Sequence, residues 1–241
     1  MSPMDQTRLT NILGAYERTC IATKLNHSPA FPICKHSTIH TFLSEYSERQ
    51  KSLVKYFRII PEFDQLSIND KMRLIRNNFT MTLSINEAAL STNISQHLID
   101  SVSMLYSANL SAQLIQCIKI LHSYIYDRTL LKLLLTIQSF TSGIQRSIYE
   151  TCTDHVYDNT RTIFAAQNIY VDLLWKYLLT RFPNEFDVVR FYDQIIRDLL
   201  FVQRVFLVTD TFVLHHSNEI QKMEPLIQSM WPVADNCANA E

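Results

Sequence analysis

Apolar residues recur along most of this chain at the spacing of one face of an α-helix. Leu9, Ile12 and Leu13 are followed by Tyr16 and Cys20 at intervals of three and four residues, which predicts an amphipathic first helix. The same spacing predicts helices over 39–60, 68–83, 114–126, 130–140, 163–182 and 188–215. The pattern therefore favours a fold made of helices.

Segments without this spacing separate the predicted helices. Residues 23–37 contain two prolines among polar residues, which predicts a loop. The helix over 39–60 ends before Pro61, because a proline ring disfavours helical geometry in the residue that precedes it. Residues 91–109 are rich in Ser and Asn, which favours a short hairpin or an irregular turn, and 141–159 favours a connection with some helix in it.

Single residues mark two further helix boundaries. Ser67 precedes Asp70 by three positions, a variant of the capping box that begins many helices. The helix that starts there is apolar around much of its circumference, which predicts a central and buried position. Pro225 suits the first turn of a short last helix, and Pro232 closes it.

The composition supports one all-α domain over 1–241. Of the 241 residues, 47% are hydrophobic, which is enough for a sizeable core. The chain contains only 2 Gly, whereas antiparallel sheets with many tight turns usually need more. We find no internal repeat and no low-complexity segment, so no domain boundary is predicted.

Charge and cysteine content limit the partners. The formal net charge is -1, so bulk charge predicts no surface for nucleic acid. The 5 Cys form no C-x-x-C pair, and an odd count fits reduced thiols in a nuclear or cytosolic protein. The most apolar stretch, 130–137, is far shorter than the roughly 20 residues that span a bilayer, so we expect no membrane association.

One window carries a specific motif. Residues 54–76 have the sequence VKYFRIIPEFDQLSINDKMRLIR. It resembles the signature of nuclear-receptor ligand-binding domains, in which a long third helix ends in a basic residue before "I-P-x-F-x-x-L", and "D-Q" and "L-L-R" open the next helix. The matching residues are Arg58, Ile60, Pro61, Glu62, Phe63, Leu66, Asp70, Lys71, Leu74, Ile75 and Arg76, and Phe79 follows where an aromatic is usual.

The resemblance extends over nearly the whole chain. The segments LTNILGAYERTC, YVDLLWKYLLTRFPN and LIQSMW are similar to the family's first, ninth and last helices, in the family's order. The resemblance implies a three-layer antiparallel helical sandwich of about 10–12 helices. It also implies that 1–4 is a hinge, 222–232 an activation helix and 233–241 a tail.

The resemblance implies a receptor in the nucleus, or in both nucleus and cytoplasm, that regulates transcription and catalyses nothing. Its partners are helical motifs of coactivators or corepressors, which lie in a groove with a basic residue at one end. DNA binding then belongs to a domain absent from this chain. The implied groove residues are Val54, Arg58, Lys71, Met72, Ile75, Arg76, Leu226, Ile227 and Met230.

The last helix departs from the family's pattern. The activation motif is two apolar residues, one free position, Glu, and two apolar residues, but this chain has Ser229 at the position of Glu. The neutral hydroxyl of Ser229 cannot make the charge-assisted hydrogen bond that a Glu carboxylate makes, and hydrogen bonds of that kind are the stronger ones. Glu224 lies upstream and is not in the matching position. Ligand-independent or repressive function therefore gains support.

The resemblance also implies an internal pocket for a small lipophilic ligand, with no cofactor. Acid-binding members of the family place an Arg where this chain has Leu90, so nothing there can pair with a carboxylate. Glu87 at a pocket position would cost free energy unless it pairs, and Arg49 is the candidate partner. The implied lining is Phe42, Tyr46, Arg49, Thr80, Leu83, Ser84, Glu87, Cys117, Phe206, Asp210 and Val213.

Dimerisation in the family, with the same or another nuclear receptor, commonly uses the tenth helix. One stripe of the helix over 188–215 must pack inside the chain, so each residue proposed for a dimer contact has an intramolecular alternative. The candidates for dimer contacts are Phe191, Tyr192, Ile195, Arg197 and Phe201.

The sequence gives little support to two other classes of function, an enzyme and a pocketless or metal-sensing helical protein. No G-x-S-x-G, H-E-x-x-H or glycine-rich phosphate loop occurs, which argues against an enzyme, and Cys34 and His36 lack further ligands nearby. His215 and His216 are candidates for a haem or metal sensor, although histidines at a helix end usually face solvent. A pocketless helical scaffold would show a repeat of about 30–45 residues, and none is found.

Overall fold

The computed structural model describes residues 1–22, 35–142 and 157–230. Within these ranges the secondary structure is helical and no β-strand occurs, which confirms the all-α prediction. Most of the predicted loop over 23–37 and of the predicted connection over 141–159 lies outside the described residues, as do Cys34 and the expected tail over 233–241.

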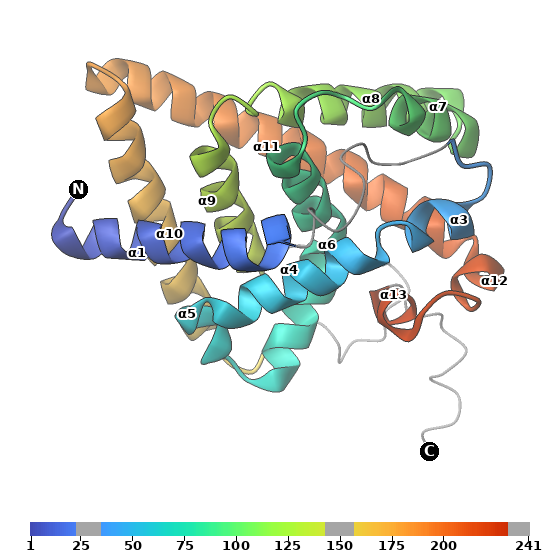
Figure 1. The fold of residues 1–241 in the computed structure, drawn as a ribbon, viewed down its shortest axis with the longest axis horizontal. Helices are drawn as coiled ribbons and strands as arrows, with labels where there is room; N and C mark the ends of the chain where they lie inside the picture. The colour runs from blue at the N-terminus through green and yellow to red at the C-terminus, as the bar shows by residue number, and fades with distance from the viewer. Residues whose placement is uncertain (23–34, 143–156, 231–241) are drawn as a thin grey trace.

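Helices of very different length make up the chain (Figure 1). The first, α1, continues directly into one π-helical segment, η1. The elements are α1 (Pro3–Tyr16), η1 (Glu17–Ile21), α3 (Ile39–Ser44), α4 (Ser47–Ile59), α5 (Pro61–Asp64), α6 (Ile68–Leu90), α7 (Gln96–Leu105), α8 (Ala108–His122), α9 (Arg128–Ser139), α10 (Thr160–Arg181), α11 (Glu185–Leu214), α12 (Ser217–Ile220) and α13 (Pro225–Met230).

Side-chain caps explain where several of these helices begin. Ser67 accepts a hydrogen bond from the backbone N–H of Asp70, so the predicted start of α6 is confirmed. Ser2 and Asp5 form a complete capping box at α1. Because α1 begins at Pro3, the expected hinge over 1–4 is helical in its second half.

Three predicted boundaries were wrong. The single helix expected over 39–60 is interrupted around Tyr46 into α3 and α4. The hairpin or irregular turn expected over 91–109 is largely the helix α7, whose apolar residues Leu98, Val102 and Leu105 have helical spacing that the surrounding serines obscured. The following helix, α8, begins at Ala108, about two turns before the predicted start.

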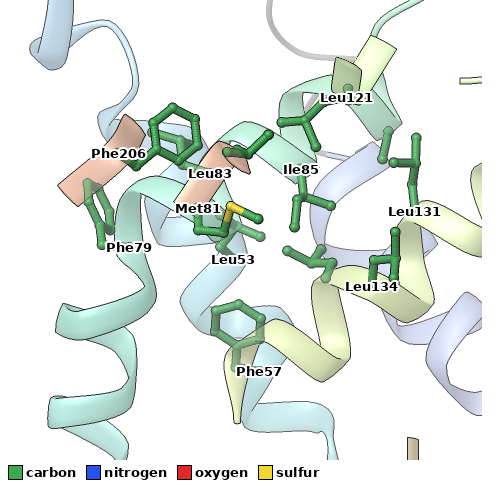
Figure 2. Packing of buried hydrophobic residues seen from close by; sticks show 14 of the residues in the cluster. Leu53, Phe57, Phe79, Met81, Leu83, Ile85, Leu121, Leu131, Leu134 and Phe206 are labelled. Atoms are coloured by element: carbon green, nitrogen blue, oxygen red, sulfur yellow. The ribbon is translucent and has the colours of Figure 1, made fainter. Parts of the chain in front are cut away.

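The helix α6 occupies the centre of the molecule, as its sequence predicted. It packs against α4, α8, α9, α11 and α13 (Figure 1). Its side chains are buried on several faces; Ile85, for example, lies among Leu121 of α8 and Leu131 and Leu134 of α9 (Figure 2). A helix buried on most of its circumference can contribute residues to sites on more than one side.

The signature window stabilises the junction of four helices. Phe63 of α5 is fully buried and contacts the rings of Phe57 and Phe140. Phe140 in turn stacks on Tyr170 of α10, whose hydroxyl donates to Glu62. Aromatic contacts of this kind stabilise a core beyond the area they bury. The proline turn between α4 and α6 is therefore held against α9 and α10.

Candidate ligand cavity and partner surface

A cavity of about 130 Å³ lies between α3, the start of α4, and α6, α7, α8 and α11. Most of its lining is aliphatic or aromatic carbon, as in sites for apolar ligands. The residues that line it are Phe42, Leu43, Tyr46, Phe79, Thr80, Leu83, Ser84, Glu87, Ala88, Ser91, Asn93, Ile94, Ser95, Leu98, Val102, Tyr106, Leu114, Ile118, Leu121, Phe206, Thr209, Asp210 and Val213.

Most of the pocket residues expected from the sequence lie in this lining. Two do not: Cys117 is fully buried in α8 without lining the cavity, and Arg49 lies behind Glu87. Sequence reasoning missed the wall that α7 contributes, because 91–109 was not expected to be a helix. The expected residues in the lining are Phe42, Tyr46, Thr80, Leu83, Ser84, Glu87, Phe206, Asp210 and Val213.

The predicted pairing of Arg49 with Glu87 is confirmed. A guanidinium N–H of Arg49 donates to Oε2 of Glu87 at 2.6 Å, and both side chains are largely buried. A buried carboxylate without such a partner would be strongly destabilising. Leu90, three residues further along α6, is buried and apolar. The cavity wall therefore carries Glu87 with its charge compensated by Arg49.

Asp210 is the second carboxylate in the lining, and it is only 4% exposed. The hydroxyl of Thr80 donates to its Oδ1 at 2.6 Å, which joins α6 to α11. Burial, and next the nearby Asp210 charge, raises the pKa of Tyr106 above its usual value, so this phenol stays neutral. Among the described lining residues the charged side chains are Glu87 and Asp210, both acidic.

The two described free cysteines, Cys20 and Cys117, are both buried. Burial raises the pKa of Cys117 to about 12 and that of Cys20 to about 12. Since the thiolate is the reactive form, neither thiol is activated at neutral pH. These two cysteines are core residues.

The short last helix, α13, packs against α6. Nε of Arg76 donates to the backbone oxygen of Ser229 at 3.0 Å, and Met230 is buried. The hydroxyl of Ser229 donates to the carbonyl of Leu226, so this side chain is used within its own helix. The described helix begins at Pro225, three residues after the expected start at 222, and residues 231–232 of the expected helix lie outside the described residues.

Two glutamates upstream of α13 contact the N-terminal half of the chain. Glu224 accepts hydrogen bonds from the hydroxyl of Ser47 at 2.7 Å and lies 3.1 Å from the ammonium of Lys51. The Ser47 hydrogen bond and then Lys51 lower the pKa of Glu224. Glu219 accepts from the backbone N–H of His40 at 2.9 Å. The segment leading to α13 is thus tied to α3 and α4.

The residues expected in the groove differ in their exposure to solvent. Arg58 is exposed at the end of α4 and has no hydrogen-bond or ionic partner among the described residues. Met72 is 52% exposed, while Val54 and Ile75 are half-buried.

Lys71 and Arg76, which were expected to add positive charge to a partner site, are both hydrogen-bonded to backbone carbonyls of this chain. Lys71 donates to the carbonyl of Asp64, and Arg76 to that of Ser229. Each therefore satisfies a carbonyl at a helix C-terminus of this chain. Leu226 is half-buried, and the side chain of Ile227 lies outside the described part.

Of the residues expected at a dimer interface, one is buried, three are half-buried and one is exposed. Ile195 is 1% exposed, Phe191 packs on Phe182, and Tyr192 packs on Trp175. Phe201 is half-buried and Arg197 is exposed. Helical periodicity could not decide which stripe packs inside. The exposed apolar residues of α11 are Phe186, Val189, Ile196, Leu200 and Val208.

The described histidines singled out in the sequence, His36, His215 and His216, bond to other groups of the chain. His36 pairs with Glu45 in a largely buried contact. His215 and His216 donate from Nδ1 to carbonyls one turn earlier in α11. Across the described ranges, no group of three or more His, Cys, Asp or Glu side chains is arranged to hold a metal ion. No helix there has the length and apolar character needed to cross a bilayer.

No model of a protein family matches the sequence, and no curated protein is significantly similar to it.

Proposed function

We propose that this chain is the ligand-binding and coregulator-binding domain of a transcription regulator of the nuclear-receptor kind. The observation that carries the proposal is the coincidence of the cavity lining with residues that the sequence resemblance implied, Thr80, Glu87 and Asp210 among them. The all-helical architecture is compatible with the family's three-layer sandwich. The proposal places the protein in the nucleus, where it binds no membrane and catalyses no reaction.

The ligand is small and carries no carboxylate. Pockets for drug-sized ligands usually measure about 300–1,000 Å³, whereas this cavity has about 130 Å³. The described lining offers no basic side chain that could pair with a carboxylate, because Arg49 is bonded to Glu87 and does not line the cavity. A neutral, mostly apolar molecule with a hydroxyl or other donor suits the lining.

The partner is an amphipathic helix. Arg58 presents a cation at the end of α4, and half-buried Val54 and Ile75 and the exposed Met72 supply apolar surface on α4 and α6. A cation placed there would stabilise the free carbonyls at the C-terminus of a docked helix. Leucine-rich coactivator helices and longer corepressor helices both fit this description.

The acidic half of such a clamp is missing. Ser229 bonds within α13, and Glu224 is engaged by Ser47 and Lys51. The proposed receptor therefore favours corepressor helices, a passive role in a dimer, or weak activation. It also follows that α13 is anchored by contacts within the chain.

A peptide-binding assay tests the partner surface. We expect fluorescence anisotropy to detect micromolar binding of a corepressor helix, and Arg58→Ala to weaken it about tenfold because a charge-assisted contact is lost. Lys55→Ala, an exposed basic residue of the same helix, is the matched control and should leave affinity unchanged. Equal binding by wild type and Arg58→Ala would remove the proposed surface.

Two further measurements complete the test. Ser229→Glu restores the missing carboxylate and should strengthen coactivator binding, whereas no gain would mean that α13 takes no part in docking. Native mass spectrometry of the purified chain should detect a retained small molecule and report the oligomeric state.

A pocketless helical scaffold is the second candidate, and the small cavity volume favours it. Ser84→Phe would fill the cavity. A scaffold should be stabilised or unaffected by this change, while a ligand-binding domain should lose its bound molecule in native mass spectrometry.

A further inference from the structure

A second hollow, of about 490 Å³, opens at the surface where the turn between α8 and α9 meets the end of α10 and the first half of α11. It is separate from the cavity described above and shares no residue with it. Its lining comprises Ser123, Tyr124, Tyr126, Asp127, Leu130, Arg181, Phe182, Phe191, Gln194 and Asp198.

Aromatic rings form much of this hollow. Phe191 lies 5.0 Å from Phe182 and 6.1 Å from Tyr124 between ring centroids. Tyr126 stands in the adjoining turn with 92% of its surface exposed, more than any other large hydrophobic side chain in the described ranges. An aromatic ring left in water beside a hollow is a surface on which a ligand group can stack.

A carboxylate bonded to neutral groups lies in the same hollow. The hydroxyl of Tyr124 donates to one oxygen of Asp198 at 2.5 Å, and the amide of Gln194 donates to the other at 2.8 Å. No basic side chain of the described chain lies within salt-bridge distance of Asp198. Burial, together with the Asp198 charge, raises the pKa of Tyr124, so this donor keeps its proton.

The negative charge of the other carboxylate in the hollow, Asp127, is compensated by a cation of the same chain. Asp127 caps the start of α9 by accepting from the backbone N–H of Leu130, and it also accepts from the hydroxyl of Tyr177. Arg181 lies 3.6 Å from Asp127 and supplies the compensating cation. The charge without a counter-ion in this hollow is therefore that of Asp198.

We propose that this hollow binds an arginine side chain of a partner protein, with its guanidinium on Asp198 and its plane on Tyr126. A planar guanidinium pairs with a carboxylate through two N–H groups and stacks on an aromatic face. The ammonium group of a lysine can pair with the carboxylate, but it has no planar surface to stack on the aromatic ring. A cation within about 6 Å of a ring centroid gains further electrostatic attraction.

Because the hollow is open to solvent, its ligand is a side chain of a partner protein and not a free small molecule. Sites for free ligands usually enclose some 70–90% of the ligand, but Tyr126 is almost fully in solvent. A side chain needs to bury only its end, because its backbone stays outside with the partner. The partner is thus a protein with an exposed arginine, and this contact is independent of Arg58 and α13.

An NMR titration of the ¹⁵N-labelled full chain tests the proposal. N-acetyl-arginine amide should shift the backbone amides of residues 123–127 and 194–198 saturably at millimolar concentration. The neutral isostere N-acetyl-citrulline amide should leave them unshifted, and N-acetyl-lysine amide should bind several-fold more weakly. Binding of citrulline as tight as that of arginine overturns the charge-based assignment, and lysine as tight as arginine overturns the guanidinium assignment.

The affinity of three variants for N-acetyl-arginine amide tests which residues make the contact. Asp198→Asn should weaken arginine binding about tenfold, the expected loss for a charge-assisted pair. Tyr126→Ala should weaken it about threefold by loss of stacking, and an exposed side chain can be removed without disturbing the fold. Asp193→Asn, on the exposed face of the same helix, is the matched control. If Asp193→Asn weakens binding as much as Asp198→Asn does, the effect is one of bulk charge and the site is disproved.

Discussion

Arg76 of α6 and Ser229 of α13 are joined by a hydrogen bond from Nε to a backbone oxygen, 3.0 Å long. The residues are 153 positions apart in the sequence. The last carbonyls of a helix have no partner within it, and a cation is the most favourable donor for them. This contact therefore fixes the end of α13 to the central helix.

Arg76→Ala should loosen α13 while leaving the rest of the fold intact. A hydrogen bond to a charged group contributes about 1.5–3 kcal/mol, so hydrogen exchange in residues 225–230 should become at least about tenfold faster. Mass-resolved exchange of peptides from this segment measures the effect. Lys222→Ala, an exposed residue of the same segment, should leave the rate unchanged. A faster rate in both variants would show that the segment opens regardless of Arg76.

Asp70→Asn should lower the free energy of unfolding. The buried carboxylate of Asp70 accepts from the backbone N–H groups of Asp158 at 2.7 Å and Asn159 at 3.1 Å, which joins the starts of α6 and α10. An amide has one acceptor oxygen and would leave a buried donor unpaired, so we expect a loss of about 1.5–3 kcal/mol in urea unfolding. Asp64→Asn, at an exposed carboxylate, should change stability by less than about 0.5 kcal/mol.

The Arg49–Glu87 pair should show strong coupling in a double-mutant cycle. Removing either partner leaves a buried charge, which costs about 3–5 kcal/mol. The combined replacement Arg49→Met with Glu87→Leu should cost much less than the sum of the two single changes. The exposed pair Lys176–Asp172 provides the comparison, with coupling near 0.5 kcal/mol. Additive losses at Arg49 and Glu87 would mean that the two charges are compensated by other groups.

At acid pH, the capping box at the start of α1 should contribute less to the stability of the fold. The side-chain and backbone hydrogen bonds from Ser2, and then Lys176, lower the pKa of Asp5 from 3.8 to about 2. The stabilisation is complete above the unfolded pKa of 3.8 and is lost as the pH falls through about 2. The stability difference between wild type and Asp5→Asn, measured by urea unfolding, should therefore be constant above about pH 5 and shrink between pH 4 and 2.

Ser2→Ala is the companion variant for this titration. It removes the main cause of the lowered Asp5 pKa, so its stability difference from wild type should shrink over the same pH interval. If the difference for either variant stays constant down to pH 2, Asp5 has no coupling to the capping box.

Local patterns predicted helices and caps well because both depend on neighbours within a few residues. The start of α6 follows from Ser67 and Asp70, and its buried position follows from an apolar circumference. The pairing of Arg49 with Glu87 was also predictable, since a buried carboxylate needs a counter-ion. The helix α7 was missed because serines within it, and serines and asparagines on either side of it, favour turns by local propensity.

Local sequence patterns could not predict contacts between segments that lie far apart in the chain. Periodicity could not show that Ile195 faces the core, because a long amphipathic helix offers several plausible faces. Nor could it show that the Asp70 carboxylate, expected only at a helix start, would bind the backbone at the start of α10.

The order of residues along this chain thus specifies most of its helices and their caps, since these follow from interactions over one or two turns. Packing determined which cations remain exposed: Arg76 and Lys71 are bound to carbonyls of neighbouring helices, and Arg58 is left at the surface. Packing also brought Asp198 beside Tyr124 and created the second hollow. Such outcomes depend on how whole helices cross, and that geometry is set by the shape of the complete core.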